Sequence, residues 1–550
     1  MNTLKEKLKN SSAGISVTFA LIFLLFFYAP VELFINNADE LTYDIFDLLK
    51  YVFPLFLLTC IVCCSLFIWL NNKSKWFHSL YIVIVTTIFF TTYVEGSFLS
   101  RFLPSINGSS LKWEDYSIHR IYSILLWIVT LSTVLIAKNK LPKSKFMDSV
   151  KYTGIIGLIF LSLSLIMSCN KDTLRDKANF SVSYDQLLDM SDDQNFIILL
   201  LDAIDGSDFK TYLDNHPESE SVFEDFTFYP DTMGTYPGTK WAVPYILSGK
   251  WFENRQSFYE YKKDAFTTSN LFDELKNRNY TLNIYETDLP QEEELIEQFC
   301  NLVQSEKSNF RHPVNFIKMQ LMLTGFRYLP FDLKRFCTLT PDNIYYDTLK
   351  NTSGANTFYW NNELFLNYIN SSEIVKTQKP CFKFIHLCGT HEPYDYTAEI
   401  DSNYSGTYED SIDLCINLID IYLNMLKESN IYDKTAVIIL GDHGSSGPVY
   451  FRQNPAFFVK GIDEHHSFST SLAPISYSDL NTCFMRLMDG CIGDQLFDAV
   501  PCDVRERRFL SPYVIDDEHI VEFFQKGYAW DEETMVESGI LFNKNSTSAT

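Results

Sequence analysis

Five apolar stretches fill most of the first 170 residues, and no other feature of the sequence limits the fold as strongly. A helix needs about 20 apolar residues to cross a bilayer, and each stretch is close to that length or longer. Because lipid offers no partners to unpaired backbone groups, such stretches fold as helices. The sequence therefore predicts a transmembrane domain over residues 1–170, with spans at 14–35, 50–70, 78–98, 119–137 and 150–169.

The connections between these spans differ in charge. Lysines cluster before the first span, between the second and third, and between the fourth and fifth: Lys5, Lys7, Lys9, Lys73, Lys75, Lys138, Lys140, Lys143 and Lys145. The other connections carry mainly acids. Since basic loops favour the cytoplasmic side, we expect the N-terminus inside and, after an odd number of spans, everything beyond Cys169 outside.

The rest of the chain is acidic and has the pattern of a soluble domain. The formal charge of the whole chain is -24 at pH 7, and most of it comes from this half. Nucleic-acid binding requires Lys and Arg to neutralise phosphates, so the acidity argues against a nucleic-acid partner. We expect a linker at 171–194, a large domain at 195–515 and a peripheral C-terminal extension at 516–550.

Short apolar runs alternate with helical patterns in the large domain. Runs typical of buried strands cover 195–201, 281–286, 381–387, 435–441 and 456–461. Helical patterns such as 270–278 and 409–428 lie between them. This alternation predicts an α/β doubly wound fold, in which ligands bind at the carboxyl ends of the strands.

Polar residues that can bind a metal follow three of these strands. Asp202 follows the first, and Asp442 with His443 follows the fourth. The third contains His386 near its end and is followed by His391. Taken alone, Asp202 is better explained as a helix cap. Oxygen and imidazole groups from separate strand ends nevertheless suit a divalent cation, so the combination favours a metal site.

A candidate nucleophile lies in the segment GTYPGTKWAVPYILSG, residues 234–249. Thr239 is predicted to begin a helix behind a turn rich in glycine and proline. The backbone N–H groups of a helix N-terminus suit an anionic phosphate. In isolation Thr239 is better explained as an N-cap, because a threonine hydroxyl is a weak nucleophile without activation. A metal held by Asp202, Asp442 and His443 would supply that activation.

Together these motifs resemble the alkaline-phosphatase-like (sulfatase-like) superfamily. They are Asp202 after a strand, Thr239 followed by Ala-Val-Pro, and the GDHG block with RQNPAFFVKG downstream. With the five preceding spans, the chain is similar to the membrane branch of that superfamily, the lipoteichoic acid synthases and phosphoethanolamine transferases. The resemblance covers nearly the whole chain and implies that residues 195–515 are a catalytic domain.

The resemblance also implies roles for individual residues. One divalent metal ion, Mn²⁺, Mg²⁺ or Zn²⁺, would be bound by Asp202, Thr239, Asp442 and His443, with Thr239 as the nucleophile. His391, in THEPY, would contact the substrate phosphate. A further substrate-binding histidine follows the NPAFFVKG strand, where His466 is the choice and His465 is nearly as good.

Three departures from the family pattern stand out. The first acid is Asp202, where the best-known branch members have Glu. Pro237 and Tyr245 lie near Thr239, where the phosphoethanolamine branch often has cysteines. The Cys-x-Pro-x-Arg sequence that sulfatases convert to formylglycine is absent, which argues against sulfate-ester hydrolysis.

Two basic features contrast with the acidic background. The segment 311–336 mixes five basic residues with many large apolar ones, so it either lies in the lipid headgroup layer or forms core helices with surface charges. Arg452, in FRQNP, is a candidate for phosphate contact, and a structural ion pair explains it equally well.

The resemblance implies a function and a location. A phosphoglycerol or phosphoethanolamine headgroup would pass from a phospholipid donor to a cell-surface glycan or glycolipid through a phospho-threonine, in a multi-pass protein of a bacterial-type plasma (inner) membrane. Two alternatives remain: an extracytoplasmic phosphodiesterase or sulfatase-like hydrolase, and a catalytically inactive glycan-binding membrane protein.

Overall fold

The computed structural model divides the chain into two compact units, which are described separately. The membrane unit comprises Met1–Lys177 and Glu306–Asn351, and the α/β unit comprises Ala178–Ser305 and Thr352–Thr550. The structure describes residues 2–38, 41–71, 75–103, 113–169, 174, 177–305, 310–339, 341–350, 356–392, 394, 406–498, 500–501, 504–512, 514 and 519–543.

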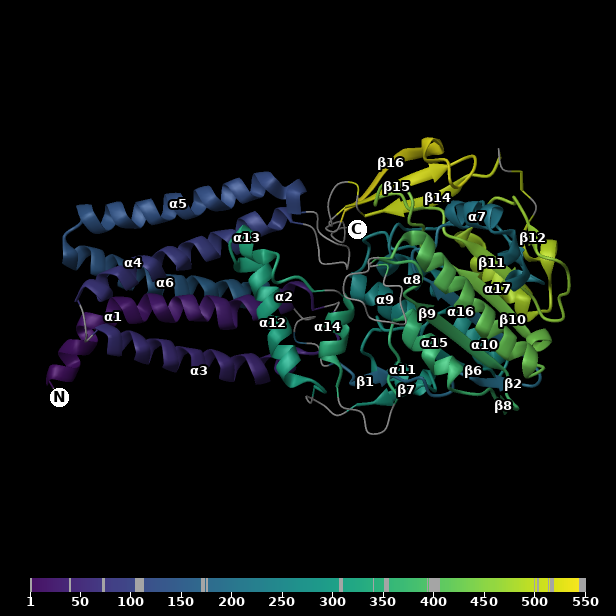
Figure 1. Ribbon diagram of the computed structural model, residues 1–550, viewed down its shortest axis with the longest axis horizontal. Coiled ribbons are helices and arrows are strands. Elements are labelled where there is room, and N and C mark those ends of the chain that lie inside the picture. The colour runs from purple at the N-terminus through teal and green to yellow at the C-terminus, as the bar shows by residue number, and fades with distance from the viewer. Residues whose placement is uncertain are drawn as a thin grey trace. The chain divides into compact units, whose positions relative to one another are not determined.

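Long apolar helices build the membrane unit (Figure 1). Their bounds are α1 Asn2–Phe23, α2 Ala29–Asn36, α3 Ile45–Asn71, α4 Lys75–Val94, α5 Ser117–Lys140 and α6 Lys143–Ser168, with a π-helical turn, Leu24–Tyr28, joining α1 to α2. Among the described residues, five segments are long and apolar enough to cross a membrane, which confirms the predicted number of spans. Helix α1 packs against α3, α4 and α6.

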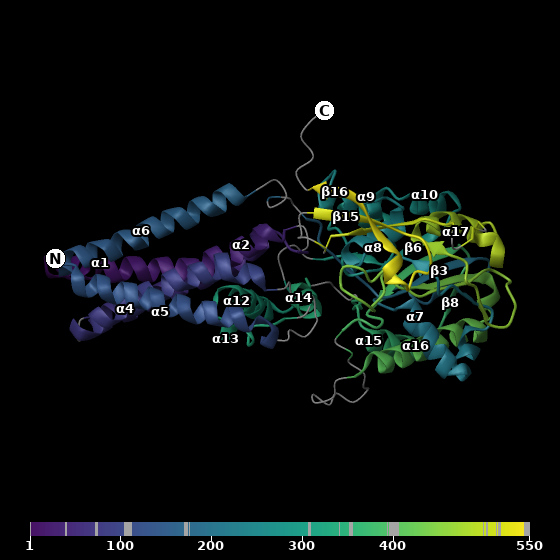
Figure 2. The same ribbon diagram turned by 90° about the horizontal axis from the view of Figure 1, so that it is seen from above.

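A segment from the middle of the chain completes the membrane unit. Helices α12 (Pro313–Tyr328) and α13 (Phe331–Lys334) pack on the N-terminal helices, and α14 (Pro341–Thr348) packs against α12 (Figures 1 and 2). This arrangement corrects the continuous 195–515 domain expected from the sequence, because residues 306–351 belong to the other unit. The basic segment 311–336 is therefore a packing element of the membrane unit.

Two ion pairs, the first partly buried and the second buried, hold this inserted segment in place. Arg327 Nη2 lies 2.7 Å from Glu32 Oε1, and Lys350 Nζ lies 2.6 Å from Asp47 Oδ2. Breaking a buried pair by removing one partner costs about 3–5 kcal/mol, because the other charge is left uncompensated. An aromatic contact adds to the interface, since the Phe316 ring lies at right angles to the Tyr43 ring.

A seven-stranded sheet forms the centre of the α/β unit, in the order β12-β4-β11-β10-β3-β9-β6. The strands are β3 Asn195–Leu201, β4 Thr227–Phe228, β6 Thr281–Tyr285, β9 Cys381–Leu387, β10 Thr435–Leu440, β11 Phe457–Lys460 and β12 Ser469–Thr470. Strands β10, β3, β9 and β6 are parallel, whereas β11 is antiparallel to both β10 and β4. The five predicted strands all form, and every residue in them except Thr281 at the start of β6 is buried.

Helices cover both faces of this sheet, which confirms the doubly wound prediction (Figure 2). One face carries α8 (Thr239–Ser248), α10 (Asn270–Asn277) and α17 (Leu480–Met488), and the other carries α7 (Gly206–Asn215), α15 (Asn362–Asn370) and α16 (Tyr408–Glu428). Helix α9 (Phe258–Thr267) packs against α8. Helix α11 (Glu293–Gln298) packs against α9 and β7.

Smaller sheets lie around this core. The two-stranded ones pair β1 (Phe180–Val182) with β7 (Leu302–Gln304), β2 (Asp189–Ser191) with β8 (Val375–Thr377), and β5 (Thr232–Met233) with β13 (Ile475–Ser476). A three-stranded sheet has the order β14 (Arg507–Ser511), β15 (His519–Gln525), β16 (Met535–Asn543). The expected boundary at 515/516 therefore divides a sheet, and the C-terminal residues up to Asn543 are part of it.

Candidate metal and nucleophile site

The site lies at the carboxyl ends of the central parallel strands. Strand β3 ends at Leu201, and Asp202 follows it with a side chain that is almost completely buried. The backbone of Asp202 is held by the neighbouring strand, because its N–H donates to Leu387 O and its carbonyl accepts from Thr390 N. Gly389 makes this possible: a Cβ atom there would lie 2.4 Å from Asp202 N.

Strand β10 places the second part of the site. It ends at Leu440, and both Asp442 and His443 follow with buried side chains. Asp442 Oδ1 accepts a hydrogen bond of 3.0 Å from Ala203 N, which ties the two loops together. His443 Nδ1 lies 2.6 Å from Gly444 O and must be the protonated nitrogen, since a carbonyl only accepts. The other ring nitrogen, Nε2, is therefore free to face the carboxylates.

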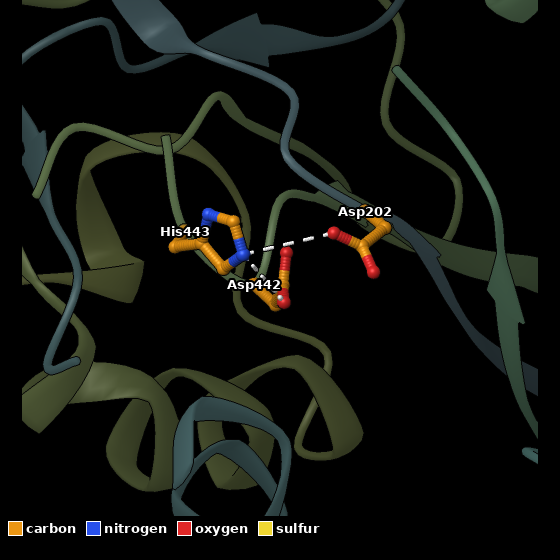
Figure 3. A group of neighbouring side chains, drawn as sticks. All are labelled: Asp202, Asp442 and His443. Atoms are coloured by element: carbon orange, nitrogen blue, oxygen red, sulfur yellow. Dashed lines mark ion pairs between the residues drawn. The ribbon is translucent and has the colours of Figure 1, made fainter. Parts of the chain in front are cut away.

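Asp202, Asp442 and His443 converge on one point (Figure 3). His443 Nε2 lies 3.7 Å from Asp202 Oδ1 and 3.5 Å from Asp442 Oδ2. Ligand atoms that share one ion at about 2.1 Å, with angles of about 90–120°, lie roughly 3.0–3.6 Å from one another. The observed separations are close to that range, so the three groups can bind the same cation.

The hydrogen-bond pattern of the two carboxylates supports this fit. Asp442 Oδ1 accepts from Ala203 N and Asp202 Oδ2 accepts from Thr239 Oγ1. The remaining oxygens, Asp202 Oδ1 and Asp442 Oδ2, are buried and have no hydrogen-bond partner among the described residues. Unpaired buried carboxylate oxygens are costly, and a divalent cation would satisfy both.

The candidate nucleophile reaches this group from another element. Thr239 is the first residue of α8, as the sequence predicts, and Gly238 before it is extended. Its hydroxyl donates to Asp202 Oδ2 over 3.2 Å. Thr239 lies at the positive end of the α8 dipole, so negative charge beside it is favoured.

Two further groups lie behind Asp202. His386, on β9, places Nδ1 2.6 Å from Glu286 Oε2 and Nε2 3.5 Å from Asp202 Oδ2. Burial would lower the pKa of His386, but the Glu286 and Asp202 carboxylates raise it well above its ordinary value. Glu286 was not among the predicted site residues, because the strand was predicted to extend over 281–286; β6 ends at Tyr285, so Glu286 follows its strand as Asp202 follows β3.

The charge balance of the site keeps Asp202 ionised. Burial alone would raise the pKa of Asp202, but the neighbouring histidines, His391 first, lower it to about 2. An ionised carboxylate is the form that binds a cation.

The expected phosphate ligands lie at the rim. His391 is partly exposed and packs against the Trp360 ring, with the two ring centres 5.4 Å apart. Arg452 lies in the loop next to His443, since its carbonyl accepts from Gly444 N. Its Nε is buried without a hydrogen-bond partner among the described residues. A structural ion pair, the alternative explanation of Arg452, is not found there.

His466 and His465 do not join the site, which corrects the expectation for both. Strand β11 runs antiparallel to β10, so residues after Lys460 lie beside the beginning of β10, whereas Asp442 follows its end. His466 Nε2 lies 3.2 Å from Glu464 Oε1, and its backbone N–H donates to Asp225. These contacts lie near the amino end of β10, whereas Asp442 follows its carboxyl end.

Comparisons with known proteins agree with this architecture. The family model described as Sulfatase matches residues 194–488. A search of curated proteins found no matching sequence.

Similar solved structures include the lipoteichoic acid synthase LtaP from Listeria monocytogenes, with 13% identity, a TM-score of 0.33, and 62% of this chain and 84% of that chain covered. The phosphoethanolamine transferase EptA from Neisseria meningitidis has 10% identity, a TM-score of 0.30, and 87% and 95% covered. An alkaline phosphatase superfamily protein from Vibrio parahaemolyticus has 15% identity, a TM-score of 0.36, and 66% and 85% covered.

Proposed function

The chain belongs to the sulfatase family, and from this premise we propose that it transfers a phospho-alcohol headgroup from a phospholipid to a surface glycan or glycolipid. One observation carries the proposal: the Thr239 hydroxyl lies 3.2 Å from a carboxylate of a buried group that can bind a cation. A hydroxyl in this position suits nucleophilic attack on phosphorus. Binding a glycan alone would require neither the nucleophile nor the cation site.

Asp202, Asp442, His443 and Thr239 are the proposed ligands of one divalent cation, Mn²⁺, Mg²⁺ or Zn²⁺. When bound, such an ion lowers the pKa of a hydroxyl and neutralises charge that develops on a phosphoryl group. Asp442 and His443 are fixed by hydrogen bonds to Ala203 N and Gly444 O, so their geometry does not depend on the ion.

The first half of the reaction forms a covalent intermediate. Thr239 Oγ1 attacks the phosphorus of the headgroup, the bond from phosphorus to the diacylglycerol oxygen breaks, and the phospho-alcohol remains on Thr239. The proton leaves the Thr239 hydroxyl, whose hydrogen bond to Asp202 orients the oxygen. The departing diacylglycerol oxygen takes up a proton, so charge balances.

The second half returns the enzyme to its starting state. A hydroxyl of the acceptor attacks the same phosphorus and the bond to Thr239 Oγ1 breaks. The acceptor loses one proton and Thr239 regains one. Both steps are displacements at phosphorus by an oxygen nucleophile, and neither changes an oxidation state. Thr239 is therefore the nucleophile of the first step and the leaving group of the second.

The rim supplies the groups that hold the phosphate. The N-terminus of α8 begins at Thr239, and the positive end of its helix dipole favours an anionic group there. His391 and Arg452 lie on the loops that flank Asp202 and His443, and each can donate to a non-bridging oxygen. Charge that develops on those oxygens in the transition state would be stabilised most by donors fixed in advance.

The five apolar helices favour a donor that resides in the membrane. A lipid donor needs an enzyme held at the surface where its headgroups lie, whereas a soluble substrate does not. In this proposal the lysine-rich connections are cytoplasmic and the α/β unit is outside.

The test is to incubate the purified full-length protein with a bacterial phospholipid extract and a divalent cation, and to follow the lipids by mass spectrometry. We expect one phospholipid class to be converted to diacylglycerol, with the matching headgroup trapped on Thr239 when acceptor is absent. Release of free phospho-alcohol at the same rate with and without glycan acceptor would replace the transferase by a hydrolase. Absence of any diacylglycerol would reject the lipid donor.

A further inference from the structure

A cavity in the membrane unit has the features of a lipid site. It has a volume of about 270 Å³ and lies between α5 and α13, which pack side by side in both views (Figures 1 and 2). Its walls are largely apolar and include Ile124, Ile128 and Phe331. None of its lining residues belongs to the α/β unit, so it is separate from the Thr239 site.

The α5 wall of this cavity continues into a surface that faces hydrocarbon. Ile124 and Ile128 are 46% and 56% exposed, and so are apolar neighbours on the same predicted span, Trp113–Lys140. Exposed apolar side chains on a membrane span contact acyl chains. A lipid chain can therefore enter the cavity from the side without crossing water.

A pair of opposite charges lies at one end of the cavity. Arg120 Nε lies 2.8 Å from Asp332 Oδ1, and their side chains are 58% and 47% exposed. An exposed pair like this contributes only about 0–1 kcal/mol, so a ligand can separate it at little cost. Arg120 is in the first turn of α5, and Ile128 lies about 12 Å deeper at a rise of 1.5 Å per residue.

This spacing matches a phospholipid with its headgroup at the charged end. The phosphate would pair with Arg120 and a chain would pack against Ile124 and Ile128. Asp332 then selects the headgroup. A carboxylate beside the phosphate repels a purely anionic lipid, and it accepts hydrogen bonds from a primary ammonium.

We propose that the cavity between α5 and α13 binds a zwitterionic phospholipid whose headgroup carries a primary ammonium, with the phosphate on Arg120 and the ammonium on Asp332. The proposal concerns binding alone and holds whichever lipid Thr239 uses.

The experiment uses full-length protein in nanodiscs that contain a trace of phosphatidylethanolamine with a diazirine in its acyl chain. After irradiation, adducts are quantified on the peptides that cover α5. Excess unlabelled phosphatidylethanolamine should reduce this labelling about tenfold, while phosphatidylcholine and phosphatidylglycerol should not. Equal competition by all three lipids would mean annular lipid only and would overturn the proposal.

Three variants locate the site. Arg120→Gln should lower specific labelling about tenfold, and Asp332→Asn should remove the preference over phosphatidylglycerol. Ile124→Trp fills the cavity without changing a charge and should also abolish specific labelling. Arg335→Gln, which removes an exposed charge outside the cavity, is the matched control. Labelling at the wild-type level in Arg120→Gln and Ile124→Trp would reject the site.

Discussion

The Thr239 hydroxyl donates a hydrogen bond of 3.2 Å to Asp202 Oδ2, although one residue begins a helix and the other follows a strand. The contact leaves Asp202 Oδ1 free to face His443 Nε2. One carboxylate thus orients the candidate nucleophile with one oxygen and can bind a cation with the other.

Replacing Thr239 by alanine should abolish turnover while leaving the fold intact. The side chain is only partly buried and its loss opens no core cavity. Removal of a catalytic nucleophile lowers kcat by about 10⁴-fold or more. Diacylglycerol release measures the effect, and circular dichroism checks the fold. Thr239→Ser retains the hydroxyl and should keep measurable activity. Full activity in Thr239→Ala would mean that another group attacks phosphorus.

Removing His443 or Asp442 should reduce the bound divalent metal. In His443→Gln or Asp442→Asn one of three converging ligands is lost, so metal content by mass spectrometry should fall well below that of the wild type. Chelation should lower the Tm of the wild type and change that of the variants little, because a ligand stabilises only the state that binds it. Asp433→Asn removes an exposed carboxylate at the other end of β10 and serves as control. Unchanged metal content in His443→Gln would reject the site.

Gly389→Ala should disturb the position of Asp202. The new Cβ would lie 2.4 Å from Asp202 N, and Gly389 has φ of 58°. Gly490 has a similar backbone, with φ of 81°, but open space around it, so Gly490→Ala isolates the conformational cost of about 1 kcal/mol. We expect Gly389→Ala to lower the Tm further than Gly490→Ala and to lower metal affinity. Equal effects of the two substitutions would show that the contact with Asp202 is unimportant.

The contribution of two buried lysines to the stability of the α/β unit should rise between pH 8 and about 10, with the raised pKa of the buried Cys415 and Cys483 opposing it above about pH 9. Burial lowers the pKa of Lys383 and Lys460 from 10.5 to about 8. Between these values the unfolded chain binds more protons, so raising the pH favours the folded state, by up to about 3 kcal/mol for each lysine. Below pH 8 both states are protonated and the cost is constant. Thermal unfolding against pH measures the slope, which should flatten in the double variant Lys383→Met, Lys460→Met. The exposed Lys434→Met should leave it unchanged.

Local sequence signals were sufficient to predict the elements that position most residues of the candidate site. The run Asn195–Leu201 is apolar after its first residue, so the sequence predicts both the buried strand and the position of Asp202 at its end. The same holds for the strand before Asp442 and for the helix that begins at Thr239 behind glycine and proline. Each of these depends on neighbours in the chain.

Features that depend on strand direction or on distant partners could not be predicted. The run 456–461 looks like any buried strand, but β11 runs antiparallel, which carries His466 away from Asp442. Composition gave two explanations for the segment 311–336. The packing of this segment depends on distant partners such as Glu32, which pairs with Arg327 almost 300 positions away in the sequence.

The insertion of residues 306–351 into the membrane unit affects how the α/β unit can be isolated. Cutting the chain near Lys177 would remove the N-terminal helices but leave α12 with Phe316 and Met319, whose packing partners would be gone. A secreted version made by one truncation would expose the apolar surface of α12 and tend to aggregate. Excising the helices and bridging Ser305 to Thr352 with a short flexible linker removes both halves of that interface at once.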